Sequence, residues 1–231
     1  MKSELFYILF YVLVLNCPVL AEDVTELIRG LEERYNQVGC LSGRIKRVVS
    51  IQEERAEIYG NFNYCRPDSF VINYLIPFKK RIVSNGDSMS ITLSDSTNVD
   101  LTGKFPMLDF NWKMFRPLLD EYNFSYRWRG EIEGYSDVIV LEGGPNKLEE
   151  VELPRILLWL DPNNQRLLRF EGYNRKDACV LILTNNQFTK IDGRYIPSDY
   201  TIYFPVAEKE KGEIHTILSN LSVLQNGEPT R

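Results

Sequence analysis

The chain has 231 residues, of which 44% are hydrophobic and 26% are charged, and its formal net charge is −5. The hydrophobic fraction is ordinary for a folded domain and excludes a disordered chain. The acidic balance argues against nucleic acid as a partner.

The first residues, MKSELFYILFYVLVLNCPVLAED, are typical of a removable export leader. Lys2 gives a positive start, a short apolar run follows, and the small residue Ala21 ends the leader. The sequence therefore predicts a signal peptide over residues 1–21, a single domain over 22–231, and export to the periplasm. Two alternatives stay open, namely a membrane anchor, for which the run is short, and lipidation of Cys17.

Apolar residues recur at helical spacing directly after the leader. The stretch 23–38, DVTELIRGLEERYNQV, predicts a helix that ends at Gly39. From there apolar and polar residues alternate, which indicates strands over 41–51 and 55–65, joined as a hairpin through residues 52–54.

A third strand carries Phe70, Ile72 and Tyr74 and stops at Pro77. The sequence Ser-Asn-Gly-Asp at 84–87 predicts a hairpin turn. The stretch 106–124, PMLDFNWKMFRPLLDEYNF, indicates short helices broken at a proline. Further strands are predicted within 126–144, 153–174, 179–191, 194–205 and 214–227, with a hairpin turn at 161–164.

These elements predict one α+β domain. About ten strands form a strongly curved antiparallel sheet, because strand twist accumulates across many strands. The two helical segments would cover its concave side. Alternation places Phe62, Tyr64, Phe70, Ile72 and Tyr74 on one face, which is either a packed core or the wall of a lipid cavity.

Three cysteines remain after the leader. The predicted hairpin brings Cys40 and Cys65 near its open end, which makes them the candidate disulfide in an exported chain. Cys179 is then a small core residue. The state in which all three thiols are reduced stays open, because sequence does not establish the geometry of the pair.

Catalytic and metal-binding patterns are missing from the sequence. His215 is the single histidine, and no CxxC pair, HExxH, GxSxG or P-loop pattern occurs. We therefore predict that the protein is not an enzyme and that it uses neither a metal nor another cofactor.

The stretch around residues 65–86 carries a resemblance to a known family. Arg66-Pro67, Phe70, Pro77 and Ile82-Val83-Ser84-Asn85-Gly86 are similar to the signature K-R-P-x-x-F-x-W, proline, I-V-S-D-G of the periplasmic lipoprotein carrier (LolA, outer-membrane lipoprotein-sorting) family. This chain departs from the signature at Cys65, Ile72 and Asn85, which replace lysine, tryptophan and aspartate. Later strands resemble the family more loosely.

The resemblance implies an incomplete β-barrel with helices as a lid over a dry cavity. The aromatic face described above would then bind acyl chains, and Phe110, Met114 and Phe115 would belong to the lid helix. Arg66 would act as a latch that bonds to carbonyls of the 106–124 insert. The alternative for Arg66 is an ordinary surface ion pair.

The function implied is that of a monomeric periplasmic carrier, or chaperone. It would shield the acyl chains of lipoproteins and ferry them from the inner to the outer membrane. Its partners would be acylated lipoproteins, an inner-membrane lipoprotein-releasing transporter and an outer-membrane acceptor. The alternatives are a carrier of free lipids or glycolipids, and an envelope domain that senses lipids or lipoproteins.

Overall fold

The structure is a computed structural model, and one helix and thirteen strands make up the part of the chain that it describes. The described residues are 19–36, 39–65, 69–85, 88–94, 97–102, 121–132, 134–147, 153–205 and 212–224. The helix, α2, spans Val19–Asn36. It is not long and apolar enough to cross a membrane.

The strands lie in one antiparallel sheet. Their bounds are β1 (Cys40–Ile51), β2 (Glu54–Cys65), β3 (Ser69–Ile76), β4 (Lys80–Ser84), β5 (Ser88–Leu93), β6 (Asn98–Thr102), β7 (Tyr122–Ile132), β8 (Tyr135–Pro145), β9 (Arg155–Asp161), β10 (Arg166–Tyr173), β11 (Cys179–Ile191), β12 (Arg194–Phe204) and β13 (Gly212–Leu224).

The first and last strands pair at the middle of the sheet. The strand order is β6-β5-β4-β3-β2-β1-β13-β12-β11-β10-β9-β8-β7. One wing therefore runs from β1 to β6 and the other from β13 back to β7. Among the described strands β6 and β7 are the two edges, so the sheet is not closed.

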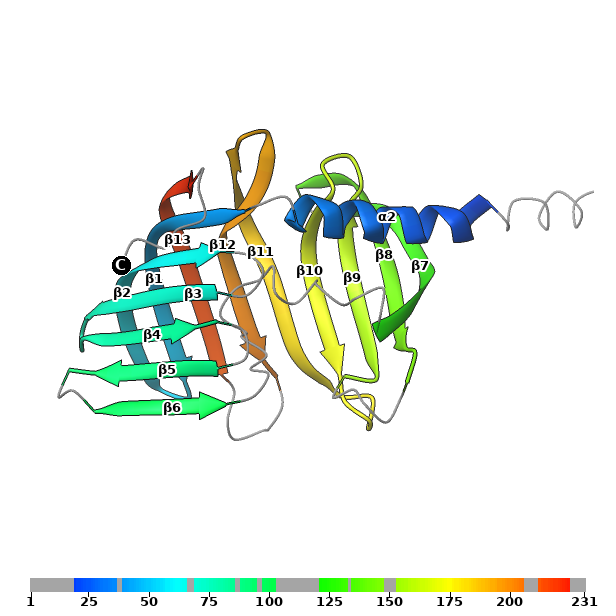
Figure 1. The fold of residues 1–231 in the computed structure, drawn as a ribbon. Helices are drawn as coiled ribbons and strands as arrows, with labels where there is room; N and C mark the ends of the chain where they lie inside the picture. The colour runs from blue at the N-terminus through cyan, green and yellow to red at the C-terminus, as the bar shows by residue number, and fades with distance from the viewer. Residues whose placement is uncertain are drawn as a thin grey trace, which may run out of the picture.

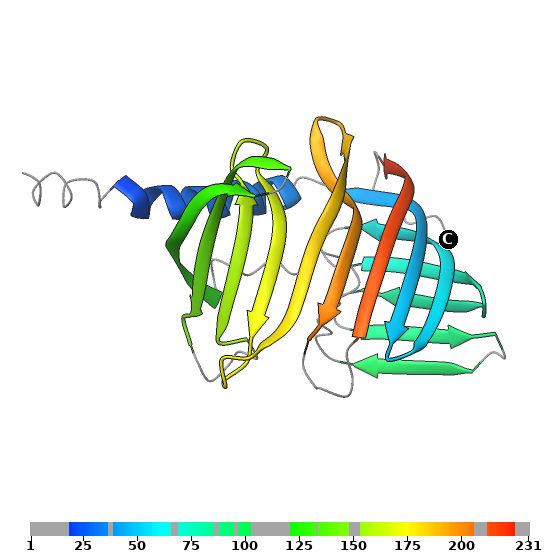
Figure 2. The ribbon, with the colours of Figure 1, turned by 180° about the vertical axis from the view of Figure 1, so that it is seen from behind.

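The sheet curves strongly. Figure 1 shows β3–β6 crossing in front of β1 and β13, with α2 on the same side across one end of β7–β10. Figure 2 shows the other side, where β13 and β1 lie in front of β3–β6 and α2 lies behind the sheet. We call the side that α2 covers the concave face. A strongly twisted and curved sheet confirms that part of the predicted architecture.

The helix packs one side against the sheet. Val24, Ile28 and Leu31 are buried at intervals of four and three residues, whereas Glu26 and Arg29 are exposed. The helix begins at Val19, four residues before the predicted start at 23. Leucine, alanine and glutamate, which precede position 23, are good helix formers and extend it.

The predicted hairpins are confirmed. Strands β1 and β2 turn through Gln52 and Glu53, and Gln52 has a positive φ of 55°. Strands β9 and β10 are joined at the predicted turn, where Asp161 accepts a hydrogen bond from the backbone N–H of Asn164 at 3.2 Å. Strand β11 coincides with the predicted range 179–191, and the Asp192-Gly193 turn follows.

The helix prediction for 106–124 is wrong at its C-terminal end. Strand β7 begins at Tyr122, because Tyr122 pairs with Pro145 of β8. Tyr122 is buried, and its hydroxyl donates a hydrogen bond to the carbonyl of Leu153 at 2.9 Å. Phe124, two residues on, packs against the main core from the same side of the strand. Residues 106–120 lie outside the described part of the chain. Strands β5 and β6 were not predicted.

Two apolar clusters form the core. The main cluster lies on the concave face, partly beneath α2, and extends over β1–β4 and β7–β13. A smaller cluster on the opposite, convex face contains Val138, Val140 and Leu168, with Tyr135, Trp159 and Phe188 packed around it. The apolar content of the concave face therefore far exceeds that of the convex face.

Candidate lipid-binding face

The aromatic residues singled out from the sequence lie side by side on the concave face. Phe62 pairs with Ile72 and Tyr64 with Phe70, across β2 and β3. Tyr74 stands opposite Gly60 in the same register. All five side chains are buried and belong to the main cluster, as the alternation predicts. Their role as the wall of an acyl-chain cavity stays a prediction.

Gly60 allows the two strands to approach closely at Tyr74. A Cβ atom at this position would lie 2.4 Å from the carbonyl oxygen of Asn73 and 3.0 Å from the Cα atom of Tyr74. The register also shifts between Tyr59 and Gly60. A side chain at position 60 would push β3 away from β2, so the glycine allows Tyr74 to pack on the concave face.

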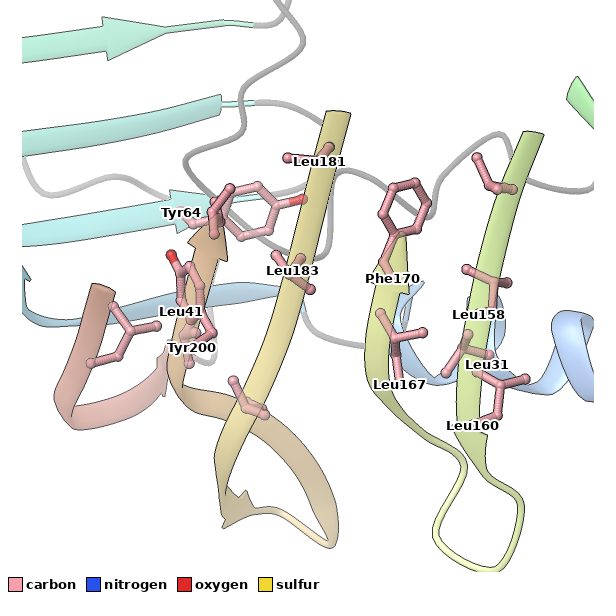
Figure 3. Packing of buried hydrophobic residues seen from close by; sticks show 14 of the residues in the cluster. Leu31, Leu41, Tyr64, Leu158, Leu160, Leu167, Phe170, Leu181, Leu183 and Tyr200 are labelled. Atoms are coloured by element: carbon pink, nitrogen blue, oxygen red, sulfur yellow. The ribbon is translucent and has the colours of Figure 1, made fainter. Parts of the chain in front are cut away.

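The other wing continues the apolar surface. In that wing Leu183 on β11 pairs with Ile202 on β12, and in the first wing Leu41 on β1 pairs with Tyr64 on β2. Figure 3 shows the Tyr64 ring pointing towards Leu181 of β11. Side chains from strands far apart in sequence therefore face one another over the concave side.

The helix covers the remote part of this surface. Figure 3 shows Leu31 of α2 beside Leu158 and Leu160 of β9. All three are buried almost completely. The described helix thus covers one end of β7–β10, which is part of the second wing. The predicted lid residues Phe110, Met114 and Phe115 lie outside the described residues, as does the predicted latch Arg66.

A positive charge lies within the concave face. Arg47 of β1 is only 6% exposed, and its Nη1 donates a hydrogen bond to the hydroxyl of Tyr74 at 2.6 Å. It lies on the same side of β1 as Leu41 and Ile45, which face the main cluster. Arg47 was not among the site residues predicted from the sequence. The sequence did contain an indication of it, because Arg47 occupies a position in β1 where the alternation would place an apolar residue.

The candidate disulfide pair is joined in the structure. Cys40 and Cys65 stand opposite each other in the β1–β2 register, with their Cα atoms 4.1 Å apart and a disulfide between them. Cys179 is a free, half-buried thiol at the start of β11. Burial, reinforced by the nearby Glu171 carboxylate, raises the pKa of this thiol, so it is mostly protonated at neutral pH.

The buried acidic residues lie away from the concave face. Asp161 pairs with Arg166, whose guanidinium stacks near Tyr135 and Phe188 beside the convex cluster. Glu171 pairs with Arg169 on the same side. Among the described residues no three histidine, cysteine, aspartate or glutamate side chains group as a metal site. Among the described residues, the concave face offers mainly apolar contact, together with the guanidinium of Arg47 and a few other buried polar groups.

Sequence comparisons gave no relatives: no protein-family model and no curated protein matches the chain. Solved structures do match. A DUF1329 family protein from Desulfovibrio piger has a TM-score of 0.70 at 18% identity, covering 90% of this chain and 95% of that chain. A domain described as an outer membrane lipoprotein-sorting protein from Vibrio parahaemolyticus has a TM-score of 0.68 at 17% identity, with coverages of 88% and 93%.

A LolA superfamily protein from Nitrosomonas europaea has a TM-score of 0.61 at 13% identity, and the match covers 90% of this chain and 94% of that chain. All three identities are low, so the likeness concerns the fold. It extends over nearly the whole length of each chain. The resemblance inferred from the motif around Arg66 is therefore confirmed as a resemblance in fold: the chain has the fold of LolA-like and outer membrane lipoprotein-sorting proteins.

Proposed function

We propose that the protein is a periplasmic carrier that shields the acyl chains of lipoproteins against its concave face and ferries them between the inner and outer membranes. The observation that carries the proposal is the extent of that face. Buried apolar side chains from β1–β4 and β7–β13 line one side of an unclosed sheet, and α2 covers only part of it.

Such a surface provides the free energy that a lipid carrier needs. Each methylene group kept from water contributes about 0.8 kcal/mol, so an acyl chain binds tightly without any chemistry. The carrier must also open, and an unclosed sheet has edges that can separate. On this proposal the protein is not an enzyme, and it acts as a monomer.

The proposed route begins with export. Cleavage after Ala21 would remove the first turn of α2, which starts at Val19. Val24, Ile28 and Leu31, which pack against the sheet, would remain. The helix would therefore keep its place in the mature protein. N-terminal sequencing of the protein from a periplasmic extract tests this step, and a start other than Glu22 would contradict it.

A carrier must also bind to membranes, and the exposed apolar residues around the β3–β4 turn are suited to this contact. Leu75, Ile76 and Phe78 lie at the turn between β3 and β4, and Phe78 is 76% exposed. Leu93 of β5, also exposed, stands opposite Lys80 in the register. We call these four residues the apolar edge. The basic residues Lys79, Lys80 and Arg81 follow directly and would attract anionic lipid headgroups.

The decisive experiment is a transfer assay. The purified protein is incubated with inner-membrane vesicles that contain a radiolabelled lipoprotein and the lipoprotein-releasing transporter, and then with outer-membrane vesicles. We expect a soluble one-to-one complex and subsequent delivery of the label. A folded protein that never forms the complex would contradict the lipoprotein proposal.

A second candidate is a carrier of free acidic lipids. Arg47 favours it, because a buried guanidinium on an apolar face matches an acidic headgroup better than a purely apolar chain. Mass spectrometry of the material that copurifies with the protein separates the two candidates. Acylated peptides would support the first and extractable free lipids the second.

A further inference from the structure

Polar side chains form a row across the middle of the concave face. Arg47 on β1 pairs with Thr216 on β13, Thr216 pairs with Tyr200 on β12, and Tyr200 pairs with Asn185 on β11. All four are buried. Apolar residues border the row along the same strands: Ile45 pairs with Leu218, and Leu183 pairs with Ile202. The row is therefore a polar band that borders an apolar surface.

Arg47 gives the band a permanent positive charge. A guanidinium is not deprotonated in proteins, so Arg47 remains charged although it is buried. The hydroxyl of Tyr74 accepts a hydrogen bond from Nη1 and fixes the orientation of the group. The guanidinium carbon lies 6.0 Å from the centre of the Tyr74 ring. A guanidinium carries five N–H donors in a fixed fork, a geometry that suits carboxylate or phosphate oxygens.

Thr216 adds a second polar group beside it. Its side chain is 0% exposed, and its hydroxyl has no hydrogen-bond partner among the residues that the structure describes. Burying a hydroxyl without a partner destabilises a protein, and such groups in native structures call for an explanation. A hydroxyl can donate to an anion, and this one stands on the strand next to Arg47.

We propose that Arg47 and Thr216 bind the anionic headgroup, a carboxylate or a phosphate, of a lipid whose acyl chains lie against the concave face. The inference rests on the proposed binding of acyl chains and adds a headgroup preference to it. Tyr74 is a positioning residue, because it acts by holding the guanidinium. The apolar residues that border the band would contact the chains.

The test compares amphiphiles that share one chain and differ in charge. Dodecanoate, dodecyl phosphate, dodecanol and dodecyltrimethylammonium each displace a fluorescent acyl probe from the full-length mature protein. We expect the two anions to bind about ten- to a hundredfold more tightly than the alcohol, and the cation to bind more weakly than the alcohol. The stronger of the two anions identifies the headgroup as carboxylate or phosphate.

Variants then assign the preference to residues. Arg47→Met keeps much of the side-chain volume and should abolish the preference for anions while dodecanol binds as before. Thr216→Val has nearly the same shape and should reduce the preference about tenfold. Tyr74→Phe should weaken it through the orientation of Arg47. Arg44→Met is the matched control, since Arg44 is exposed on the other face of the same strand and should leave the preference unchanged.

The outcomes separate this inference from the proposed function. Equal binding of dodecanoate, dodecyl phosphate and dodecanol by the unmodified protein would overturn the headgroup site and leave the acyl carrier standing. Absence of binding by all four amphiphiles would overturn both. An unchanged anion preference in folded Thr216→Val and Arg47→Met would overturn the assignment of these residues. If Arg47→Met does not fold, Thr216→Val and Tyr74→Phe decide the question.

Discussion

Ile72 of β3 stands directly opposite Phe62 of β2, and both side chains are buried almost completely in the concave face. If this pair contacts acyl chains, Ile72→Glu should abolish uptake of a fluorescent acyl probe. Burying a carboxyl group in an apolar site costs several kcal/mol, whether the group is charged or protonated. Fluorescence titration measures uptake, and circular dichroism reports the fold.

Two control variants show whether the loss is specific. Val71→Glu places the same charge on the other face of β3, next in sequence to Ile72, and should retain uptake. Ile72→Val should lower stability by about 1 kcal/mol and leave uptake nearly intact. Normal uptake by a folded Ile72→Glu protein would mean that this part of the face does not contact the probe.

Arg66 lies outside the described residues, and its role as a latch comes from the resemblance alone. If its guanidinium bonds to carbonyls of the 106–124 insert, Arg66→Leu should favour the open, loaded state by about ten- to a hundredfold. The variant should take up cargo and release it slowly to acceptor membranes. Arg55→Leu, at an exposed position of β2, is the control. Equal release rates for both variants would reduce Arg66 to a surface charge.

The Cys40–Cys65 disulfide closes a loop with a sequence separation of 25 residues, which contains the whole β1–β2 hairpin. In the chain-entropy model, a loop of this length stabilises the folded state by about 3 kcal/mol. Cys40→Ser with Cys65→Ser should therefore lower the free energy of unfolding by about that amount, measured by urea denaturation. Cys179→Ser should change it little, and reductant should destabilise only proteins that retain the pair. An equal midpoint with and without reductant would contradict the prediction.

The elements that the sequence predicted best are local. The β1–β2, β9–β10 and β11–β12 hairpins were placed within a few residues, because alternation and turn residues act between neighbours in sequence. Strands β5 and β6 were missed although apolar and polar residues alternate strictly in SMSITL and NVDLT. Their serine, asparagine and aspartate residues are typical of loops, and this composition concealed the alternation.

Long-range pairing was beyond the sequence for a different reason. The partner of β1 on one side is β13, some 170 residues away, and no local pattern specifies that choice. The same pairing brings Thr216 beside Arg47. The aromatic face could be predicted from the alternation of residues along β2 and β3. The polar band, in contrast, depends on contacts between strands distant in sequence. Arg47 itself was overlooked because only apolar residues were followed along the alternation.

Asp161 should make stability depend on acid pH. Burial alone would raise the pKa of this carboxyl, but hydrogen bonds from Asn164 and Arg166 outweigh it and hold the pKa below its ordinary value of 3.8. A group whose pKa is lower in the folded state contributes stability above the unfolded pKa and loses it as pH falls through the folded pKa. The contribution should thus be present at neutral pH and disappear below about pH 4.

Asp161→Asn tests this dependence. The variant should be less stable than the unmodified protein at neutral pH, because it leaves Arg166 without its carboxylate partner, and this difference should be smaller at about pH 2. Urea denaturation at both pH values gives the two free energies of unfolding. Asp192→Asn, at an exposed turn, is the control. A constant difference between Asp161→Asn and the unmodified protein across this range would contradict the assigned pKa direction.

The apolar edge gives the last prediction. Phe78 and Ile76 are exposed, and Lys79 follows Phe78 in sequence, so the edge should insert its side chains among the headgroups of anionic vesicles. Phe78→Ser should weaken binding to vesicles of phosphatidylglycerol and phosphatidylethanolamine about ten- to a hundredfold, measured by cosedimentation. Lys79→Gln should weaken it less, and added salt should remove the effect of Lys79→Gln but not that of Phe78→Ser. Val99→Ser, at an exposed position of β6, is the matched control and should bind normally. If Phe78→Ser and Val99→Ser bind vesicles equally well, the edge does not contact the membrane, and the acyl probe measurements on Ile72 are unaffected by that result.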